Sequence, residues 1–246
     1  MVQIAASRPI SSPPEAAPSR ADLTRRRILE AASRVFRRQG LDATRMRDIA
    51  AEVGMHTGNL YYYFRDKGEL LAFCQEATLD RLLALAARAE AADLAADAKL
   101  RLLVSGHVVA LNEEVPGSLA HLEIEAIDAA RRPAIIERRD SYEETWRRVI
   151  EDGIAAGVLR EVDADTAARA LLGAVNWTVK WYRADGDRSA LEIGEDFADL
   201  LVGGLLVGSA RRPRAITPRV PSRRTGAARN SKRQPPAPQR GKRRPR

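Results

Sequence analysis

The chain has 246 residues, of which 45% are hydrophobic, so it can bury the core of one large domain or of two ordinary ones. No apolar run approaches the roughly 20 residues of a membrane span, and the N-terminus lacks the apolar stretch of a secretory signal. The single cysteine, Cys74, excludes an internal disulfide, and we expect it to be a small buried side chain rather than a nucleophile. These features favour a cytoplasmic protein with no membrane partner.

The net charge of +8 is unevenly distributed along the chain. Residues 1–67 hold 12 basic and 7 acidic side chains, residues 68–210 hold 15 and 26, and residues 211–246 hold 14 and none. An acidic middle therefore lies between two basic ends. Basic segments favour a polyanion as partner, which we expect to bind the ends rather than the middle.

Residues 1–21 are rich in proline, serine and alanine and are expected to form a disordered arm. From Asp22 onward the pattern is helical. Apolar residues recur at helical spacing between Ile28 and Phe36, and Gly40 then offers a stop. The sequence therefore predicts a first helix directly after the arm.

Two short helices should follow. Apolar residues at i, i+3, i+4 and i+7 from Met46 to Val53 form the core-facing stripe of the first one. Thr44 stands ahead of it as the expected N-cap, and Gly54 marks its end. The second runs from about Thr57 to Phe64. Two short amphipathic helices joined by a tight turn predict a helix-turn-helix, with the motif at about residues 45–64.

The third helix contains the aromatic run "LYYYF", and helical phase separates its side chains. Leu60 and Phe64 fall together and should anchor the helix in a core. The other face and its borders carry the remaining residues, Thr57, Gly58, Asn59, Tyr61, Tyr62 and Tyr63. Hydroxyls and an amide on an exposed helix suit the major groove of DNA, where they can reach phosphates and base edges.

Basic residues beside this helix favour the same partner. Arg45 and Arg47 begin the second helix, where free backbone N–H groups favour a phosphate, and Lys67 follows the third helix. Each has a plainer alternative, since Thr44 can be only a cap and the arginines only solvated. For Tyr63, packing against the core is as well supported as contact with DNA.

The segment "TRRRILEAASRVFRRQGLDATRMRDIAAEVGMHTGNLYYYFRDKGELL" resembles the DNA-binding domain of the TetR family of bacterial transcriptional regulators. The resemblance covers about residues 22–70 and includes the patterns "T-x-x-R-D-I-A-x-x-x-G" and "G-N-L-Y-Y-Y-F-x-x-K". It implies phosphate contacts by Thr44, Arg45 and Lys67, base readout by Arg47, Thr57, Gly58 and Asn59, and a clamp on the DNA backbone by Tyr61, Tyr62 and Tyr63. His56 replaces a small capping residue, so it either caps less well or touches DNA.

The remaining chain is also expected to be helical, giving an all-α fold of about nine helices. We call residues 22–68 the head and residues 69–210 the body. A long helix should start the body, and breaks rich in glycine, proline and aspartate delimit further helices at residues 98–112, 118–131, 134–156, 164–183 and 190–208.

In the body, the family resemblance implies ligand binding and homodimerisation, hence a palindromic operator in double-stranded DNA. The candidate residues of the ligand pocket are His107, His121, Trp146, Asn176 and Trp177. A lone histidine is more often a satisfied structural group, and a helical tryptophan is more often core. The candidate residues of the dimer interface, which lie on two nearly all-apolar helices, are Trp181, Phe197, Leu200, Leu201 and Leu205. A core within one chain is the alternative for them.

The segment from Asn176 to Gly186, with the pattern "N-W-x-x-x-W-Y-R-x-x-G", is similar to a TetR subgroup of catabolic repressors, several of which respond to acyl-coenzyme A thioesters. The resemblance therefore implies a small-molecule effector, for which an acyl-coenzyme A is the candidate class. We expect no cofactor and no bound metal.

Residues 211–246 are expected to be a disordered tail that binds DNA without sequence preference or that only aids solubility. An enzyme is disfavoured, because glycine-rich phosphate loops and metal-ligand spacings are absent and the three histidines are far apart. The pairs Glu113/Glu114 and Glu143/Glu144 are interpreted as ordinary helix-surface charges. The other rival is a nonspecific, nucleoid-type DNA binder, which would discriminate weakly between sequences.

Overall fold

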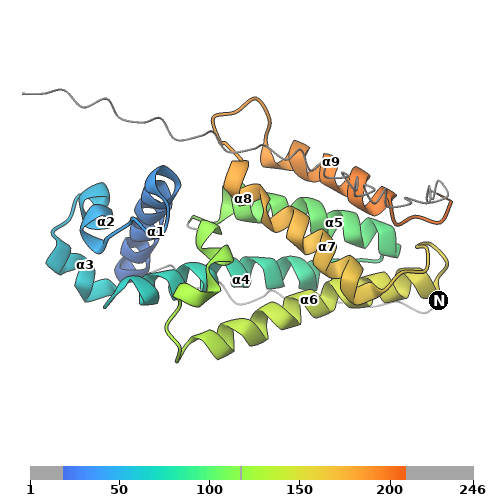
Figure 1. Ribbon diagram of the computed structural model, residues 1–246, viewed down its shortest axis with the longest axis horizontal. Coiled ribbons are helices and arrows are strands. Elements are labelled where there is room, and N and C mark those ends of the chain that lie inside the picture. The colour runs from blue at the N-terminus through green and yellow to red at the C-terminus, as the bar shows by residue number, and fades with distance from the viewer. Residues whose placement is uncertain (1–18, 117, 209–246) are drawn as a thin grey trace, which may run out of the picture. The chain divides into compact units, whose positions relative to one another are not determined.

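The computed structural model describes residues 19–116 and 118–208. Within these ranges the secondary structure is helical apart from one isolated antiparallel bridge between Leu159 and Leu206, so the all-α prediction is confirmed (Figure 1). No helix in the described part of the chain is long and apolar enough to cross a membrane. The predicted tail and all but the last residues of the predicted arm lie outside the described residues.

The head consists of α1 (Arg20–Gln39), α2 (Met46–Val53) and α3 (Thr57–Tyr63). The prediction that the arm reaches residue 21 was wrong, because the Ser19 side chain accepts from the Asp22 backbone N–H at 3.1 Å and so starts α1 earlier. The predicted core faces are confirmed, since the most deeply buried head side chains include Ile28, Phe36, Ile49, Leu60 and Phe64.

The loops of the head depart from the prediction at one cap. Thr44 is not the N-cap of α2, because its hydroxyl donates to the Gly40 carbonyl at 2.6 Å and Arg45 takes the cap position. The Asp48 carboxylate accepts from the Arg45 backbone N–H at 2.9 Å instead. Gly54 ends α2 as predicted, in the left-handed conformation with φ 75° and ψ 37°.

The body contains α5 (Ala96–Val109), α6 (Arg132–Ala155), α7 (Ala164–Asn176), α8 (Thr178–Trp181) and α9 (Ala190–Gly203). Helix α9 runs along α5 (Figure 1). A Cβ on Gly194 would lie 2.9 Å from the Cα and the carbonyl oxygen of Ser105, so a glycine is needed where α9 approaches α5 most closely.

Helix α4 (Lys67–Ala91) belongs to both head and body. Leu70, Leu71 and Cys74 lie in the head core, whereas residues from Leu82 to Ala89 lie in the body core. The boundary at residue 68 therefore does not divide the two cores. Cys74 is fully buried as expected, and burial raises the pKa of its thiol to about 12, which keeps it unreactive.

The helix predicted at residues 118–131 is absent, and short 3-10 turns stand at Ser118–Leu122 and Ile124–Ala126. Side chains from α6 and its first turn bind the carbonyls that an α-helix would use. Arg139 donates to the His121 carbonyl at 2.7 Å, and Arg132 donates to the Glu125 carbonyl at 3.0 Å. These tertiary contacts override the local helical pattern.

The helix predicted at residues 164–183 is interrupted at Trp177 between α7 and α8. A π-helical segment, Ala110–Glu114, extends α5 and carries Asn112 inward. The Asn112 amide donates to the Thr178 hydroxyl at 2.8 Å, and that hydroxyl donates to the Val175 carbonyl at 2.7 Å. This buried polar pair fixes the break, because an unpaired polar group there would be costly.

Gly54→Ala should lower the free energy of unfolding by about 1 kcal/mol, since an alanine in the left-handed region is strained. A Cβ at this site meets no atom within 4 Å, so the whole cost lies in the backbone. Urea denaturation followed by circular dichroism measures the difference. Gly203→Ala is the matched control, because Gly203 is equally unobstructed and has no positive φ; equal losses in the two variants would contradict the assignment.

Candidate DNA-binding surface and body cavity

Helix α3 exposes the face that helical phase predicts. Leu60 and Phe64 are buried, whereas Tyr62 is 86% exposed and Tyr61 is 50% exposed. Gly58 and Asn59 are also exposed, and a Cβ on Gly58 would meet nothing within 4 Å. The helix is thus anchored on one side, with an open polar and aromatic surface on the other.

Two residues left open by the sequence have distinct surroundings. Tyr63 is half-buried and packs against the head core, with its ring edge-on to Tyr62 at 5.3 Å between centroids. His56 is exposed at the N-cap position of α3, and its side chain makes no capping hydrogen bond. The structure therefore supports packing for Tyr63 and leaves the His56 imidazole at the surface beside the half-exposed Thr57.

The basic candidates divide into two groups. Arg45 and Arg47 are exposed at the start of α2, where Arg47 lies 3.6 Å from Asp48. In contrast, Thr44 is only 2% exposed, and the Lys67 ammonium donates to the Leu41 carbonyl. These two side chains hold the turn between α1 and α2. The Thr44 hydroxyl is buried there, whereas the half-buried Lys67 ammonium keeps two further N–H donors.

A cavity of about 250 Å³ lies in the body among α4, α5, α6 and α7. Its lining is mixed, with polar side chains beside two leucines from α4 and α7. The lining residues are Leu79, His107, His121, Arg139, Tyr142, Glu143, Arg169, Leu172, Gly173 and Asn176.

His107 bridges two walls of the cavity. Its Nε2 lies 3.1 Å from Asn176 Oδ1, and its Nδ1 lies 3.0 Å from the Tyr142 hydroxyl. An amide oxygen can only accept, so Nε2 carries the proton and Nδ1 accepts from Tyr142. Burial lowers the pKa of His107 to about 4, and burial with the nearby Arg139 charge lowers the pKa of His121 well below its usual value. Both rings are therefore neutral at pH 7.

The cavity brings together only some of the ligand-pocket candidates. His107, His121 and Asn176 line it, whereas Trp146 packs edge-on against His107 in the core and does not line it. Trp177 lies outside the cavity, because at the turn between α7 and α8 its side chain is 60% exposed. The sequence missed the cavity residues of α6 and Arg169 of α7, since α6 is polar on most sides and its inward face has no distinctive pattern.

The candidate residues of the dimer interface differ in their exposure. Leu200 is 74% exposed and Trp181 is 45% exposed, with the Trp181 ring stacked on Phe197 at 6.2 Å between centroids. Leu205 is only 8% exposed and belongs to the body core, so the alternative of a core within one chain holds for it. Phe197 and Leu201 are half-buried against that same core.

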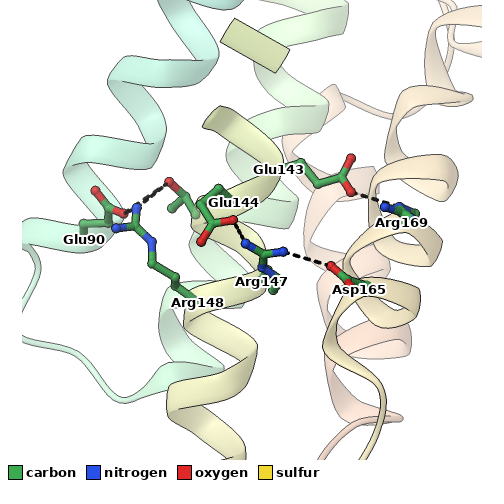
Figure 2. Close-up of polar contacts among 8 residues, drawn as sticks. Glu90, Glu143, Glu144, Arg147, Arg148, Asp165 and Arg169 are labelled. Atoms are coloured by element: carbon green, nitrogen blue, oxygen red, sulfur yellow. Dashed lines mark hydrogen bonds and ion pairs between the residues drawn. The ribbon is translucent and has the colours of Figure 1, made fainter. Parts of the chain in front are cut away.

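The glutamate pairs lie at the surface or half-buried, and their carboxylates connect neighbouring helices. Glu113 accepts from the Tyr182 hydroxyl at 2.6 Å and from the Ala190 backbone N–H at 2.8 Å, which fixes the start of α9. Glu143 pairs with Arg169 at 3.0 Å across α6 and α7 (Figure 2).

Further ion pairs extend this network around α6. Arg147 pairs with Glu144 on its own helix and with Asp165 at the start of α7, at 3.2 Å from the latter (Figure 2). Arg148 pairs with Glu90 at the end of α4. Charged side chains of α6 therefore connect it to both neighbouring helices, although such exposed pairs each add little to stability.

Comparison with known proteins gives matches along most of the chain. Residues 28–73 match the family described as "Bacterial regulatory proteins, tetR family", and residues 93–205 match "Tetracyclin repressor-like, C-terminal domain". The HTH-type transcriptional repressor KstR2 of Mycobacterium tuberculosis is 30% identical over 185 residues, which cover 72% of this chain and 90% of that protein.

Solved structures give similar matches. The TetR family transcriptional regulator PfmR from Thermus thermophilus matches with a TM-score of 0.66 and 33% identity, over 73% of this chain and 98% of that one. AibR, in complex with isovaleryl coenzyme A and operator DNA, matches with a TM-score of 0.63 and 25% identity, over 74% of this chain and 97% of that one.

The free energy of unfolding should fall as pH is lowered from 6.5 toward 4, by on the order of 2 kcal/mol from His107 alone. Unfolded chains accept a proton on histidine near pH 6.5, whereas folded His107 does so only near pH 4, so unfolding takes up protons in this window. Urea titrations at several pH values measure the slope. His107→Gln should be less stable at neutral pH but show a shallower slope; an unchanged slope would contradict the assignment.

Proposed function

Because the chain belongs to the tetR family of bacterial regulatory proteins, its role is transcriptional regulation, and we propose that it represses by binding a palindromic operator as a homodimer. The observation that carries this proposal is the exposed face of α3. Its Tyr62 is 86% exposed while Leu60 and Phe64 anchor the helix in the head core. A regulatory rather than enzymatic role and action in the bacterial cytoplasm form part of the proposal.

At the operator, α3 lies in the major groove. Gly58 and Asn59 approach the base edges, and Tyr61 and Tyr62 reach the flanking phosphates. Arg45 and Arg47 bind phosphates from the start of α2, where backbone N–H groups add to the attraction. The buried hydroxyl of Thr44 keeps the preceding turn in place, and the Lys67 ammonium, which bonds to the Leu41 carbonyl, has further donors for a phosphate. A dimer places two such helices about one DNA turn apart.

A small molecule in the body cavity controls this binding. Helix α6 lines the cavity. The segment before it contacts the turn ahead of α4 through Arg65–Asp128 at 3.3 Å and the first turn of α4 through Arg131–Glu69 at 3.1 Å. A shift of α6 on ligand binding is therefore passed to the helix that holds the head core. The ligand changes operator affinity only to the extent that it binds the arrangement after the shift of α6 more tightly than the arrangement before it.

Footprinting on the promoter region of its own gene tests the operator proposal. A protected palindrome supports it, whereas uniform protection of all fragments would favour a nucleoid-type binder. The same experiment at several salt concentrations separates sequence readout from the charge contribution of phosphate contacts.

Gly58→Ala should weaken operator binding at least about tenfold while leaving the fold intact. The added methyl meets nothing in the free protein, so a loss of affinity reports the approach of α3 to the bases. Fluorescence anisotropy with an operator duplex measures the change. Gly203→Ala, remote from the head, is the matched control, and equal operator affinities for the two variants would contradict this placement of α3.

We propose an acyl-coenzyme A thioester as the effector class. The proposal is supported by the resemblance of the segment from Asn176 to Gly186 and by the isovaleryl coenzyme A in the AibR structure. A cavity of about 250 Å³ can hold only a part of an acyl-coenzyme A, and the rest of the molecule would extend outside it.

A panel of acyl-coenzyme A thioesters should include one that raises the melting temperature and releases the operator duplex. Thermal shift and anisotropy measure the two effects on the same protein, with free coenzyme A as the control. A panel without any response in either assay would exclude the class.

A further inference from the structure

Arg139 is a cavity residue whose hydrogen bonds go only to neutral partners, while the carboxylates of Asp140 and Glu143 are near enough to favour its charge. It lies half-buried on α6, and its Nη1 donates to the His121 carbonyl at 2.7 Å and to Gln75 Oε1 at 3.3 Å. In the part of the chain that the structure describes, it forms no ion pair with a carboxylate. Half-buried arginines usually have such a partner, because removing their charge from water is costly.

The other charges of the cavity are already paired with each other. Glu143 and Arg169 both line it and lie 3.0 Å apart, joining α6 to α7 (Figure 2). The Arg169 side chain is 70% exposed, so the pair lies where the cavity meets solvent. Glu143 thus forms its ion pair with Arg169 at the edge of the cavity and not with Arg139 inside it.

Among the side chains that line the cavity, the positive charges outnumber the negative ones by one. His107 and His121 are neutral at pH 7, and Glu143 offsets Arg169, so Arg139 remains as the excess cation of an otherwise polar cavity with two leucines. A planar guanidinium suits the two oxygens of a carboxylate or phosphate. An apolar body with one anionic group would match this lining.

We propose that Arg139 recognises an anionic group on the effector, and that Glu143 weakens this recognition by repelling the anion and holding Arg169. The inference rests on the proposed function, because it names the chemistry that the effector cavity accepts. The anionic group can be a free carboxylate or a phosphate of a coenzyme A thioester, and both present the same oxygens to Arg139.

The alternative role of Arg139 is purely structural, as the side chain that holds the His121 carbonyl. That role predicts a stability loss on substitution without any change in the preference for charged over neutral ligands. Charge preference is therefore the readout that separates recognition from support.

The experiment uses the full-length protein with three probes of one acyl group: octanoate, the neutral octanamide, and octanoyl-coenzyme A. Isothermal titration calorimetry should give at least about tenfold tighter binding for an anionic probe than for octanamide. Arg139→Gln should remove that preference. Glu143→Gln should strengthen binding of the anionic probe, because it removes the repulsion and frees Arg169. Arg138→Gln is the matched control, since Arg138 pairs with Asp80 and does not line the cavity.

If octanoate binds more tightly than octanamide, the anionic group is a free carboxylate. If only octanoyl-coenzyme A binds, the anionic group is a coenzyme phosphate. Either result supports the proposal, provided that Arg139→Gln abolishes the preference for the anionic probe. Equal binding of octanamide, no binding of any probe, or a preference retained in Arg139→Gln overturns it. Should Arg139→Gln not fold, Glu143→Gln decides, and unchanged affinity overturns the proposal. Operator footprinting needs no ligand. If it shows a protected palindrome while calorimetry shows no preference for the anionic probes, this inference is refuted and the operator proposal stands.

Discussion

Helix α4 takes part in both hydrophobic cores, and the relation between ligand and DNA depends on it. Its first turns bury Leu70, Leu71 and Cys74 beneath α1 to α3, and its later turns bury Leu82 and Leu85 in the body. Close-packed side chains resist deformation, so a displacement of one part of this helix is felt at the other. The head therefore cannot change its position independently of the helix that forms one wall of the cavity.

A small third cluster lies between these two cores. Leu79 lines the cavity and also packs with Ile127 and Ile135, which flank the start of α6. The Arg65–Asp128 and Arg131–Glu69 pairs reach the same segment from the turn ahead of α4 and from its first turn. Apolar contacts and ion pairs thus both join α4 to the segment that precedes α6. This junction gives effector binding a physical route to the head.

The head and the cavity differ in how far the sequence could predict them. In the head, the core that orients α3 is formed within residues 28–74, and the helical period of Ile49, Leu60 and Phe64 was sufficient to predict which face is buried. In the cavity, Arg139 and Tyr142 come from a helix that is polar on most sides, and their partners lie far away in the sequence. His107 was recognisable only as a rare residue type, because its bonds to Tyr142 and Asn176 depend on three helices meeting.

The sequence by itself determined the all-α class, the helix-turn-helix and the exposed face of α3, because helical periodicity and glycine stops act within a few residues. Only the tertiary structure decided that Thr44 is buried, that residues 118–131 form short turns, and that Trp177 faces outward while Leu205 faces inward. Thr44 is held by the Gly40 carbonyl four residues earlier. Arg132 and Arg139 of α6 bind the carbonyls of Glu125 and His121, and the body core takes up Leu205. Such long-range competition has no signature in a single sequence.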